Sequence, residues 1–150
     1  MDIQKLNHFL YNELPLARAL QIEVQRADRS SVLLRAPFAP NRNAHGSAFG
    51  GSLAALGILG GWATVYSRLH LDGIDAALVI KTSHCDYQAP ITSDICVEAA
   101  ISDAQWTDFL AYFQSHGKAR ISVDSRLVGE DGKQGALHTG TYVAMRPDKH

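Results

Sequence analysis

The sequence has few cysteines, little net charge and no hydrophobic leader. Its 150 residues include two cysteines, Cys85 and Cys96, which lack the C-x-x-C spacing of a zinc site, and the formal net charge is −1 at pH 7. A balance so close to neutral gives no electrostatic reason to expect binding to nucleic acid or to an anionic membrane. Residues 1–16 contain acidic residues and no continuous apolar core, unlike a secretory signal. We therefore expect a cytoplasmic protein with reduced thiols.

Charge is also absent from a long central stretch. Residues 48–71 read AFGGSLAALGILGGWATVYSRLHL, with no charged side chain from Ala48 to Ser67 and no polar stripe on a helical wheel. A helix that is apolar on all sides is buried on all sides, and these 24 residues would span about 36 Å as a helix. Each of the five glycines weakens a helix by about 1 kcal/mol relative to alanine, which we expect only where a sheet packs closely against them.

The same stretch has the length of a transmembrane span, which is the competing interpretation. Five glycines, two serines and a threonine, the lack of a second hydrophobic segment and the lack of a basic cluster at either end count against it. We therefore expect a buried central helix within a single domain of residues 1–150, which is long enough to bury a sizeable core.

Periodic patterns flank this helix. Apolar residues at helical spacing predict a helix over residues 2–13, which Pro15 should end, and a short helix over residues 106–113. Alternation predicts strands near residues 20–25, 32–36, 76–88, 95–101, 119–127 and 137–145, with an irregular loop at 37–48. One small sheet cannot cover a long helix on every side, so the uncovered remainder favours a dimer.

The strand expected at 76–88 carries polar residues on both faces. Strict alternation places on one face Leu78, Ile80, Thr82, His84 and Asp86, and on the other face Ala77, Val79, Lys81, Ser83, Cys85 and Tyr87. Such a strand is typical of a sheet that borders a site or a subunit interface.

Three motifs resemble those of a known family. They are Asn41-x-Asn43-x-His45-Gly46-Ser47-x-Phe49-Gly50-Gly51-Ser52-Leu53 at the helix entry, Tyr87-x-x-Pro90-x-x-x-Asp94 after the next strand, and Asp131-Gly132…His138-Thr139-Gly140-Thr141-Tyr142 near the end. Through them, residues 14–146 resemble the hotdog-fold thioesterases, and most closely the family that also forms the C-terminal domain of some bacterial acetyltransferases, the YiiD C-terminal family. The first motif is fairly specific, whereas the other two occur in hotdog proteins generally.

The resemblance implies an α+β hotdog fold, in which a six-stranded antiparallel sheet wraps around one long helix, here residues 49–70. An N-terminal helix and a short additional helix complete the expected fold. The resemblance also implies a homodimer or a dimer of dimers with its sites at the subunit interface. The implied substrate is a small-molecule acyl thioester, acyl-CoA in particular, with coenzyme A as part of the substrate and no other cofactor.

The glycines at the helix entry suggest where a thioester carbonyl binds. A helix that begins at Phe49-Gly50-Gly51 offers unpaired backbone N–H groups, and the missing side chains let an oxygen approach them. Donors aimed at a developing oxyanion lower a barrier by about 3–4 kcal/mol. We assign this role to the N–H of Gly51, helped by Gly50. The alternative is that both glycines only allow a tight turn into the helix.

Polar residues of the preceding loop are the candidates for positioning water. An imidazole can donate or accept near neutral pH, so His45 is expected to orient the carbonyl or a water molecule. Asn43 is expected to orient water or to hold His45, and Asn41 to do the same one step back, unless both asparagines merely close turns. The residues expected to border the substrate are Asn41, Ser47, Phe49, Gly50, Ser52 and Tyr87, although helix capping is the favoured role of the two serines.

The chain departs from the family pattern in its acid. Related hotdog thioesterases carry a histidine at the helix entry and an acidic residue further along the helix, where this chain has Phe49 and Ile58. Asp86, supplied by a partner subunit, is the candidate carboxylate, and an exposed strand-end aspartate is the alternative. A triad of Ser47, His45 and Asp86 is disfavoured because nothing in the sequence fixes its geometry.

The missing acid keeps other functions open. It favours, as the second hypothesis, a non-catalytic module that binds acyl-CoA or an acyl carrier. A dehydratase of the same fold would need a paired histidine and acid, and no clear pair is present. His84, His116 and His138 occur on expected strands or turns without ligand-like spacing, so no metal site is expected. The 106–113 helix is expected to be packed, with a lid over the acyl chain as the alternative.

Overall fold

The computed structural model describes residues 1–147. Its helices and strands are α1 (Ile3–Glu13), α2 (Pro15–Leu20), β1 (Glu23–Ala27), β2 (Ser31–Ala36), the 3-10 helix η1 (Ala39–Asn41), α3 (Gly50–Leu71), β3 (Ala77–Tyr87), β4 (Ile95–Ala100), α4 (Asp103–His116), β5 (Lys118–Gly129) and β6 (Gln134–Met145). Within this part of the chain no helix is long and apolar enough to cross a membrane.

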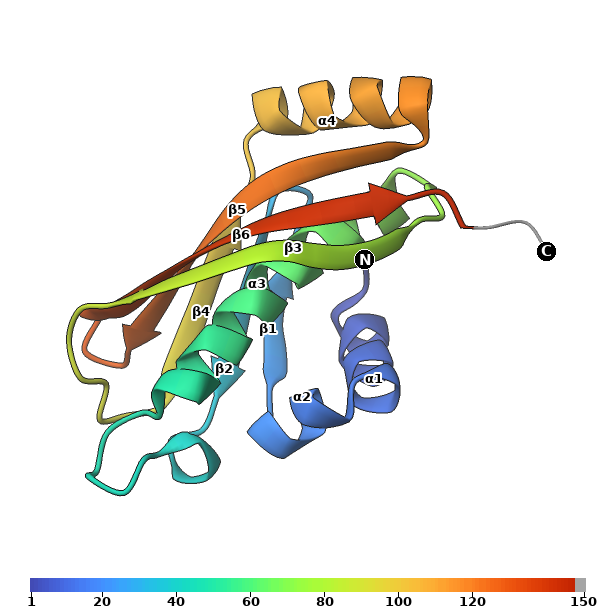
Figure 1. The fold of residues 1–150 in the computed structure, drawn as a ribbon. Coiled ribbons are helices and arrows are strands. Elements are labelled where there is room, and N and C mark those ends of the chain that lie inside the picture. The colour runs from blue at the N-terminus through green and yellow to red at the C-terminus, as the bar shows by residue number, and fades with distance from the viewer. Residues whose placement is uncertain (148–150) are drawn as a thin grey trace.

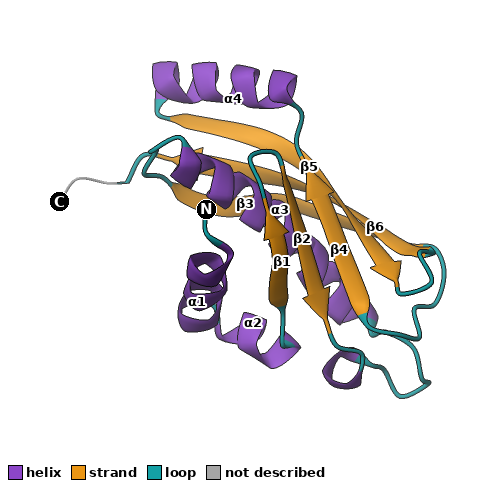
Figure 2. Ribbon diagram, turned by 180° about the vertical axis from the view of Figure 1, so that it is seen from behind, coloured by secondary structure: helices purple, strands orange, loops and turns teal. Residues whose placement is uncertain are grey.

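One antiparallel sheet of six strands, in the order β1-β2-β4-β5-β6-β3, curls around α3 (Figure 1). Seen from behind, the strands cover α3, while α1 and α2 lie beside the β1 end of the sheet (Figure 2). The helix α4 lies against β5 near the C-terminal end of α3 (Figure 1). The six-stranded sheet around one long helix, predicted from the sequence, is confirmed.

The glycines of α3 face the sheet, as the sequence predicted. A methyl group added at Gly60 would lie 2.7 Å from Cγ1 of Val97 on β4, and one at Gly57 or Gly61 would collide with His138 or Tyr142 on β6. Real Cβ atoms do not approach neighbours so closely, so the small residues let the sheet lie directly on the helix backbone. The stability that these glycines cost the helix is offset by this contact.

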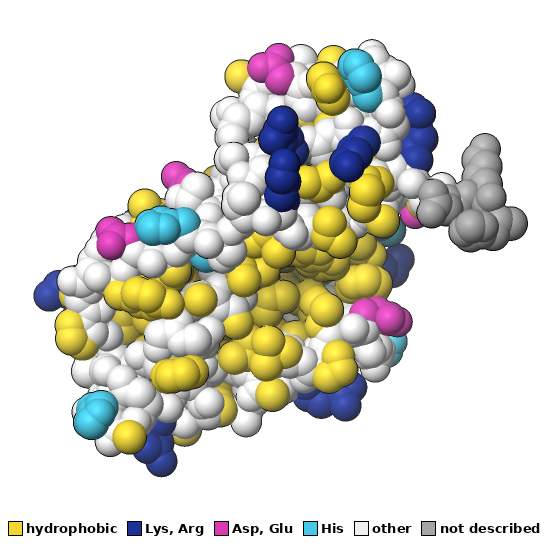
Figure 3. Space-filling view, in the orientation of Figure 1, with side chains coloured by type: hydrophobic (Ala, Val, Ile, Leu, Met, Phe, Trp, Pro, Cys, Tyr) yellow, Lys and Arg dark blue, Asp and Glu magenta, His cyan; other side chains and the backbone are white. Residues whose placement is uncertain are grey.

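One side of α3 is only half buried. Its side chains form a stripe that consists of Ala54, Ala55, Ile58, Trp62 and Tyr66. The rings of Trp62 and Tyr66 stack on each other and on Phe9 of α1, with centroids 4.6–5.9 Å apart. Figure 3 shows hydrophobic side chains gathered in a hollow on this face. One chain therefore covers its central helix incompletely.

A β-bulge changes which residues of β3 face the helix. Ile80 pairs with Tyr142 and Thr82 pairs with Thr141, so Lys81 is an extra residue between two regular stretches. Beyond it the alternation is reversed, and the face directed at α3 carries Leu78, Ile80, Ser83, Cys85 and Tyr87. The prediction that Ile80, His84 and Asp86 share a face is therefore wrong.

The N-terminal region differs from its prediction in one element. Pro15 does end α1, but it also begins α2, because proline suits the first position of a helix. Leu20 consequently belongs to α2, and the strand begins at Glu23 rather than near residue 20. The helix predicted at 106–113 is longer than expected. A capping box of Ser102 and Gln105 starts it, and it contains His116, which was expected on a strand or turn.

Candidate functional site

The start of α3 has no side-chain cap. Its N-cap is Phe49, and no side chain accepts a hydrogen bond from the first turn. The expectation that Ser47 or Ser52 caps the helix is therefore wrong: the Ser47 hydroxyl is bonded to Asn43, and Ser52 is a buried residue of the helix itself. The first N–H groups of an α-helix have no intrahelical acceptor and carry partial positive charge. Gly51 in this turn is exposed, so the helix start is open to an anionic oxygen.

Asn43 holds the loop that leads into α3. Its Oδ1 accepts hydrogen bonds from the backbone N–H groups of His45, at 2.7 Å, and Ser47, at 3.1 Å, and its Nδ2 donates to Oγ of Ser47 at 2.8 Å. Both polar atoms of the amide thus bond within the loop. These contacts favour the turn-closing alternative for Asn43. They also hold the backbone of His45, whose side chain is exposed.

Asn41 fixes the path of the chain into α3 through hydrogen bonds to neighbouring backbone groups. Its side chain is 1% exposed, and Nδ2 donates to the carbonyls of Leu20 and Pro37 at 2.9 Å each. Its backbone carbonyl accepts the N–H of Phe49 at 2.7 Å. Asn41 therefore joins the end of α2 to the start of α3. This buried position fits anchoring of the site better than contact with a substrate.

Two aromatic rings border the helix start. The Tyr87 hydroxyl donates to the Gly50 carbonyl at 2.9 Å, and its ring lies 3.4 Å from the place where a Gly50 side chain would begin. The Phe49 ring lies over Gly51 so closely that a methyl group there would collide with it. Both rings remain more than half exposed. The Phe49 ring thus excludes a side chain at Gly51 in this arrangement, whereas at Gly50 the distance to Tyr87 is that of an ordinary van der Waals contact.

A cavity of about 330 Å³ opens beside the helix start. It is lined by residues of the helix entry and by residues at and after the end of β3, among them Ser47, Ala48, Gly50, Leu53, Tyr87 and Ile91. Most of the lining residues are apolar, aromatic or glycine, and the polar side chains among them include Ser47 at the helix entry and Gln88 after β3. A cavity of this kind suits an apolar chain whose polar end lies at the N-terminus of α3.

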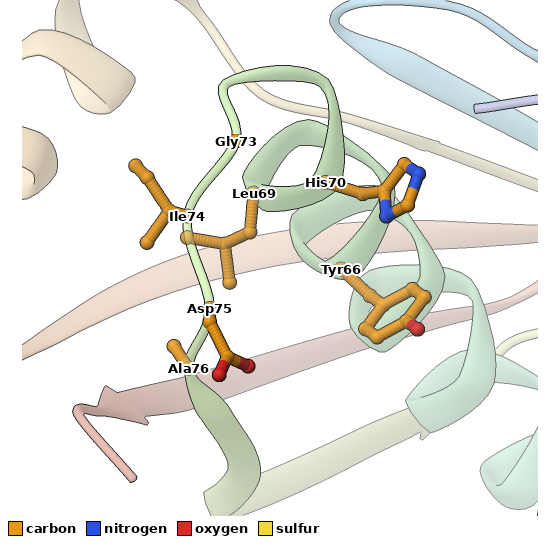
Figure 4. Close-up of a pocket in the computed structure, with 7 residues that line it drawn as sticks. All are labelled: Tyr66, Leu69, His70, Gly73, Ile74, Asp75 and Ala76. Atoms are coloured by element: carbon orange, nitrogen blue, oxygen red, sulfur yellow. The ribbon is translucent and has the colours of Figure 1, made fainter.

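A second cavity, of about 270 Å³, lies at the opposite end of α3. Figure 4 shows Tyr66, Leu69 and His70 of the helix around it, together with Asp75 of the following turn. A helix C-terminus carries partial negative charge, and Asp75 adds a carboxylate. This end is therefore unsuited to a developing oxyanion. The helix α4 lines neither cavity, so the structure gives no support to a role for it as a lid.

Asp86 is not part of the cluster at the helix start. It pairs in register with Leu137 on the face of the sheet that points away from α3, and its Oδ2 accepts a hydrogen bond from Gln88 at 3.2 Å. A role for its carboxylate across a subunit interface stays a prediction. Ile58, at the position where many related hotdog thioesterases are expected to carry an acidic residue, is half buried. Across residues 1–147 no group of three or more His, Cys, Asp or Glu residues is placed to bind a metal.

One polar pair was not found by sequence reasoning. His138 is fully buried on β6 and its Nε2 lies 2.7 Å from Oγ of Ser83 on β3. The two residues are 55 positions apart in the chain, and they meet only because the bulge at Lys81 turns Ser83 towards the helix. No local signal in the sequence indicates such a bulge.

Comparison with known proteins agrees with this architecture. A family model described as a putative thioesterase (yiiD_Cterm) matches residues 3–146. A putative thioesterase from Shewanella oneidensis is 28% identical over 97% of each chain, with a TM-score of 0.86. A protein of unknown function from Chlorobaculum tepidum TLS is 25% identical, over 96% of this chain and 94% of that one, with a TM-score of 0.90. A thioesterase from Haemophilus influenzae, 14% identical over 100% and 94% of the two chains, shares the fold with a TM-score of 0.79. The hotdog fold predicted from the sequence is confirmed.

Proposed function

Because this chain belongs to the putative thioesterase family of the YiiD C-terminal type, we propose that it hydrolyses acyl thioesters and that acyl-CoA is its substrate. The observation that carries the proposal is the uncapped, glycine-lined start of α3 beside a cavity of about 330 Å³. The cavity takes the acyl chain, and the helix start takes the carbonyl oxygen. Coenzyme A enters as part of the substrate, and the chemistry calls for no further cofactor.

The N–H of Gly51, helped by that of Gly50, stabilises the oxyanion that forms when the carbonyl carbon is attacked. Such donors are worth about 3 kcal/mol of barrier. His45 positions water or the thioester through its exposed ring, and Asn43 contributes by fixing the backbone of His45 at 2.7 Å. Phe49 and Tyr87 border the bound thioester, because both rings lie at the helix start.

The working unit is proposed to be a homodimer, alone or within a dimer of dimers. The strand β3 is eleven residues long, forms one edge of the sheet and contains no buried residue. A long exposed edge with an apolar stripe beside it is a surface that native proteins normally cover. A second copy of the chain, joined along β3, would cover both. We place this assembly in the cytoplasm, which suits two cysteines that form no disulfide.

The test of this function is thiol release by the purified protein from a panel of short, long and aromatic acyl-CoAs. We expect turnover on one of these classes, and we expect His45→Ala to lower kcat by about 10²-fold because a positioned imidazole is lost. The control is His116→Ala, an exposed histidine at the end of α4. Wild-type turnover in His45→Ala would remove His45 from the mechanism.

The alternative function, a non-catalytic acyl-CoA or acyl-carrier binding module, has one specific observation in its favour. The position of the family's helix acid is Ile58, and Asp86 lies on the far face of the sheet. This alternative predicts saturable binding of the same acyl-CoAs in calorimetry with no thiol release. Thiol release by the purified wild type that is lost in His45 variants would exclude this alternative.

A further inference from the structure

The hydrogen bond between Ser83 and His138 joins an accessible hydroxyl to a fixed imidazole. In the single chain, Ser83 is exposed on the edge strand, on the face that lies beside α3, whereas His138 is 0% exposed. The His138 ring packs directly on Gly57, where any side chain would collide with it. The ring therefore cannot swing away, and Nε2 stays 2.7 Å from the Ser83 hydroxyl.

The surroundings of the imidazole favour its uncharged form. Burial lowers the pKa of His138, with a smaller opposing effect from Asp124 and a smaller supporting effect from His84. Within residues 1–147 its Nδ1 is buried and has no hydrogen-bond partner. No carboxylate is hydrogen-bonded to this ring, and the charge of Asp124, which favours the protonated form, is outweighed by burial. A neutral imidazole next to a hydroxyl is the arrangement that a serine nucleophile needs for its general base.

We propose that Ser83 is the nucleophile of the thioesterase reaction and that His138 is its general base. The inference rests on the proposed function and supplies the group that Ile58 cannot. It is carried by the 2.7 Å hydrogen bond, by the accessible Ser83 hydroxyl and by the fixed, buried His138 ring.

The reaction proceeds in two balanced halves. Oγ of Ser83 bonds to the carbonyl carbon while its proton passes to Nε2 of His138. The carbon–sulfur bond then breaks, and the thiolate takes that proton and leaves as a free thiol, which gives an acyl ester on Ser83. In the second half, water attacks the ester and gives a proton to His138, and His138 returns it to Oγ of Ser83 as the carboxylic acid leaves.

The position of the pair indicates which helix start serves it. Gly57, against which His138 packs, is about 9 Å further along α3 than Gly51. One carbonyl carbon cannot contact Ser83 while its oxygen lies at Gly51 of the same chain. In the homodimer proposed above, two β3 strands joined about a twofold axis would run antiparallel, and a pairing centred on Cys85 would place Tyr87 of one copy opposite Ser83 of the other. The nucleophile of one copy then works with the helix start of the second copy.

The first test is covalent labelling with phenylmethanesulfonyl fluoride, read by intact mass and peptide mapping. We expect one sulfonyl group on Ser83, no label in Ser83→Ala, and slower labelling in His138→Gln. The control is Ser122→Ala, because Ser122 is also an exposed strand serine whose hydroxyl bonds to a side chain, Thr141 at 3.3 Å, but has no histidine partner. The control variant should label as the wild type does.

The second test is acyl-CoA turnover by the same variants. We expect Ser83→Ala to lower kcat by about 10²-fold or more with little change in KM, and Ser122→Ala to leave kcat within about twofold. Ser83→Cys should recover part of the turnover and accumulate an acyl adduct in the mass spectrum. Since Ser83 is exposed, the Ser83 variants should have a Tm close to that of the wild type, and a thermal melt checks this. The test at Ser83 therefore does not depend on whether His138→Gln folds.

The outcomes separate this inference from the proposed function. Turnover that survives in Ser83→Ala, with no label on Ser83, would overturn the nucleophile and leave a thioesterase. A labelled Ser83 in a protein that hydrolyses none of the acyl-CoAs would support the nucleophile and overturn the proposed substrate. For the arrangement across two copies, co-refolding Ser83→Ala with an inactive Gly51→Val variant should restore about a quarter of wild-type activity, since half of the molecules pair as mixed dimers with one intact site each. No recovery in such mixtures would overturn that arrangement.

Discussion

The two ends of α3 are built in opposite ways. At the C-terminal end, Arg68 is 4% exposed, its Nε lies 3.5 Å from Oδ2 of Asp72, and its guanidinium lies over the Trp106 ring. Trp106 donates to the same carboxylate at 2.8 Å. At the N-terminal end, the first turn of α3 has no side-chain cap, and Gly50 borders a cavity. Cations suit the negative end of a helix dipole, and an empty positive end suits an anion. The C-terminal end is held by paired side chains, although a cavity of about 270 Å³ lies beside it, whereas the first turn at the N-terminal end has no such partners.

The largest expected effect is a loss of stability when the contacts at the C-terminal end of α3 are removed. Arg68→Ala removes the cation from beside Asp72 and leaves that carboxylate partly buried, so we expect a loss of about 3 kcal/mol in the free energy of unfolding. Urea denaturation measures this loss. Thiol release per folded molecule should stay close to wild type, because the change lies at the far end of the helix from the cavity beside Gly50. A stable variant with lower turnover would show that the two ends are not independent.

The next expected effect is a loss of turnover when the N-terminal end of α3 is blocked. Gly51→Ala adds a methyl group that collides with the Phe49 ring and narrows access to the backbone N–H groups. We expect kcat to fall by about 10²-fold, the loss typical of one oxyanion donor, and urea denaturation to show a much smaller change than in Arg68→Ala. Leu71→Ala, at an exposed position near the C-terminal end of α3, is the matched control. Unchanged turnover in Gly51→Ala would exclude the helix start as the oxyanion site.

The smallest expected effect is on the pH dependence of stability, through Asp94 beside the loop that leads to the N-terminal end of α3. Asp94 accepts hydrogen bonds from Arg35 at 2.8 Å and from the N–H of Phe38 at 2.9 Å, and the Arg35 contact lowers the pKa of this carboxyl. A lowered pKa in the folded protein adds stability that is present above the ordinary value of 3.8 and is lost as the pH falls through the lowered one. Asp94→Asn should therefore be less stable than wild type near neutral pH, and the difference should shrink below that value. Unfolding curves between pH 7 and pH 2.5 would show it, and a constant difference would contradict it.

Several parts of this fold follow from the sequence because they depend on side chains that repeat. The uncharged run at 48–67 predicted the central helix, and its glycines predicted the close contact that Gly57 and Gly61 make with β6. The glycine entry and the loop before it were also found. What they do could not be predicted, because one amide can close a turn or hold a water molecule. In the folded protein both polar atoms of the Asn43 amide bond within the loop, and this depends on the path of the backbone.

The sequence-based predictions that proved wrong depend on backbone geometry that the local side-chain pattern does not indicate. Pro15 can end one helix or begin another, and here it does both. Alternation along β3 fails after Lys81, and with it the expected face of Asp86. The pairing of Ser83 with His138 depends on the register of two strands far apart in the chain. Local patterns fix which residues form an element, but register and bulges depend on how elements meet.

The bulge at Lys81 also bears on how chains of this family can differ in length. Lys81 has no partner of its own on β6, while its neighbours Ile80 and Thr82 pair with consecutive residues. A shorter chain that lacked this one position would therefore keep every other side chain of β3 on its present face. Loss or gain of a residue in a regular stretch of the strand would instead exchange the two faces. Natural variation in the length of this strand should accordingly concentrate at a single point, where it leaves the chemistry on both faces untouched.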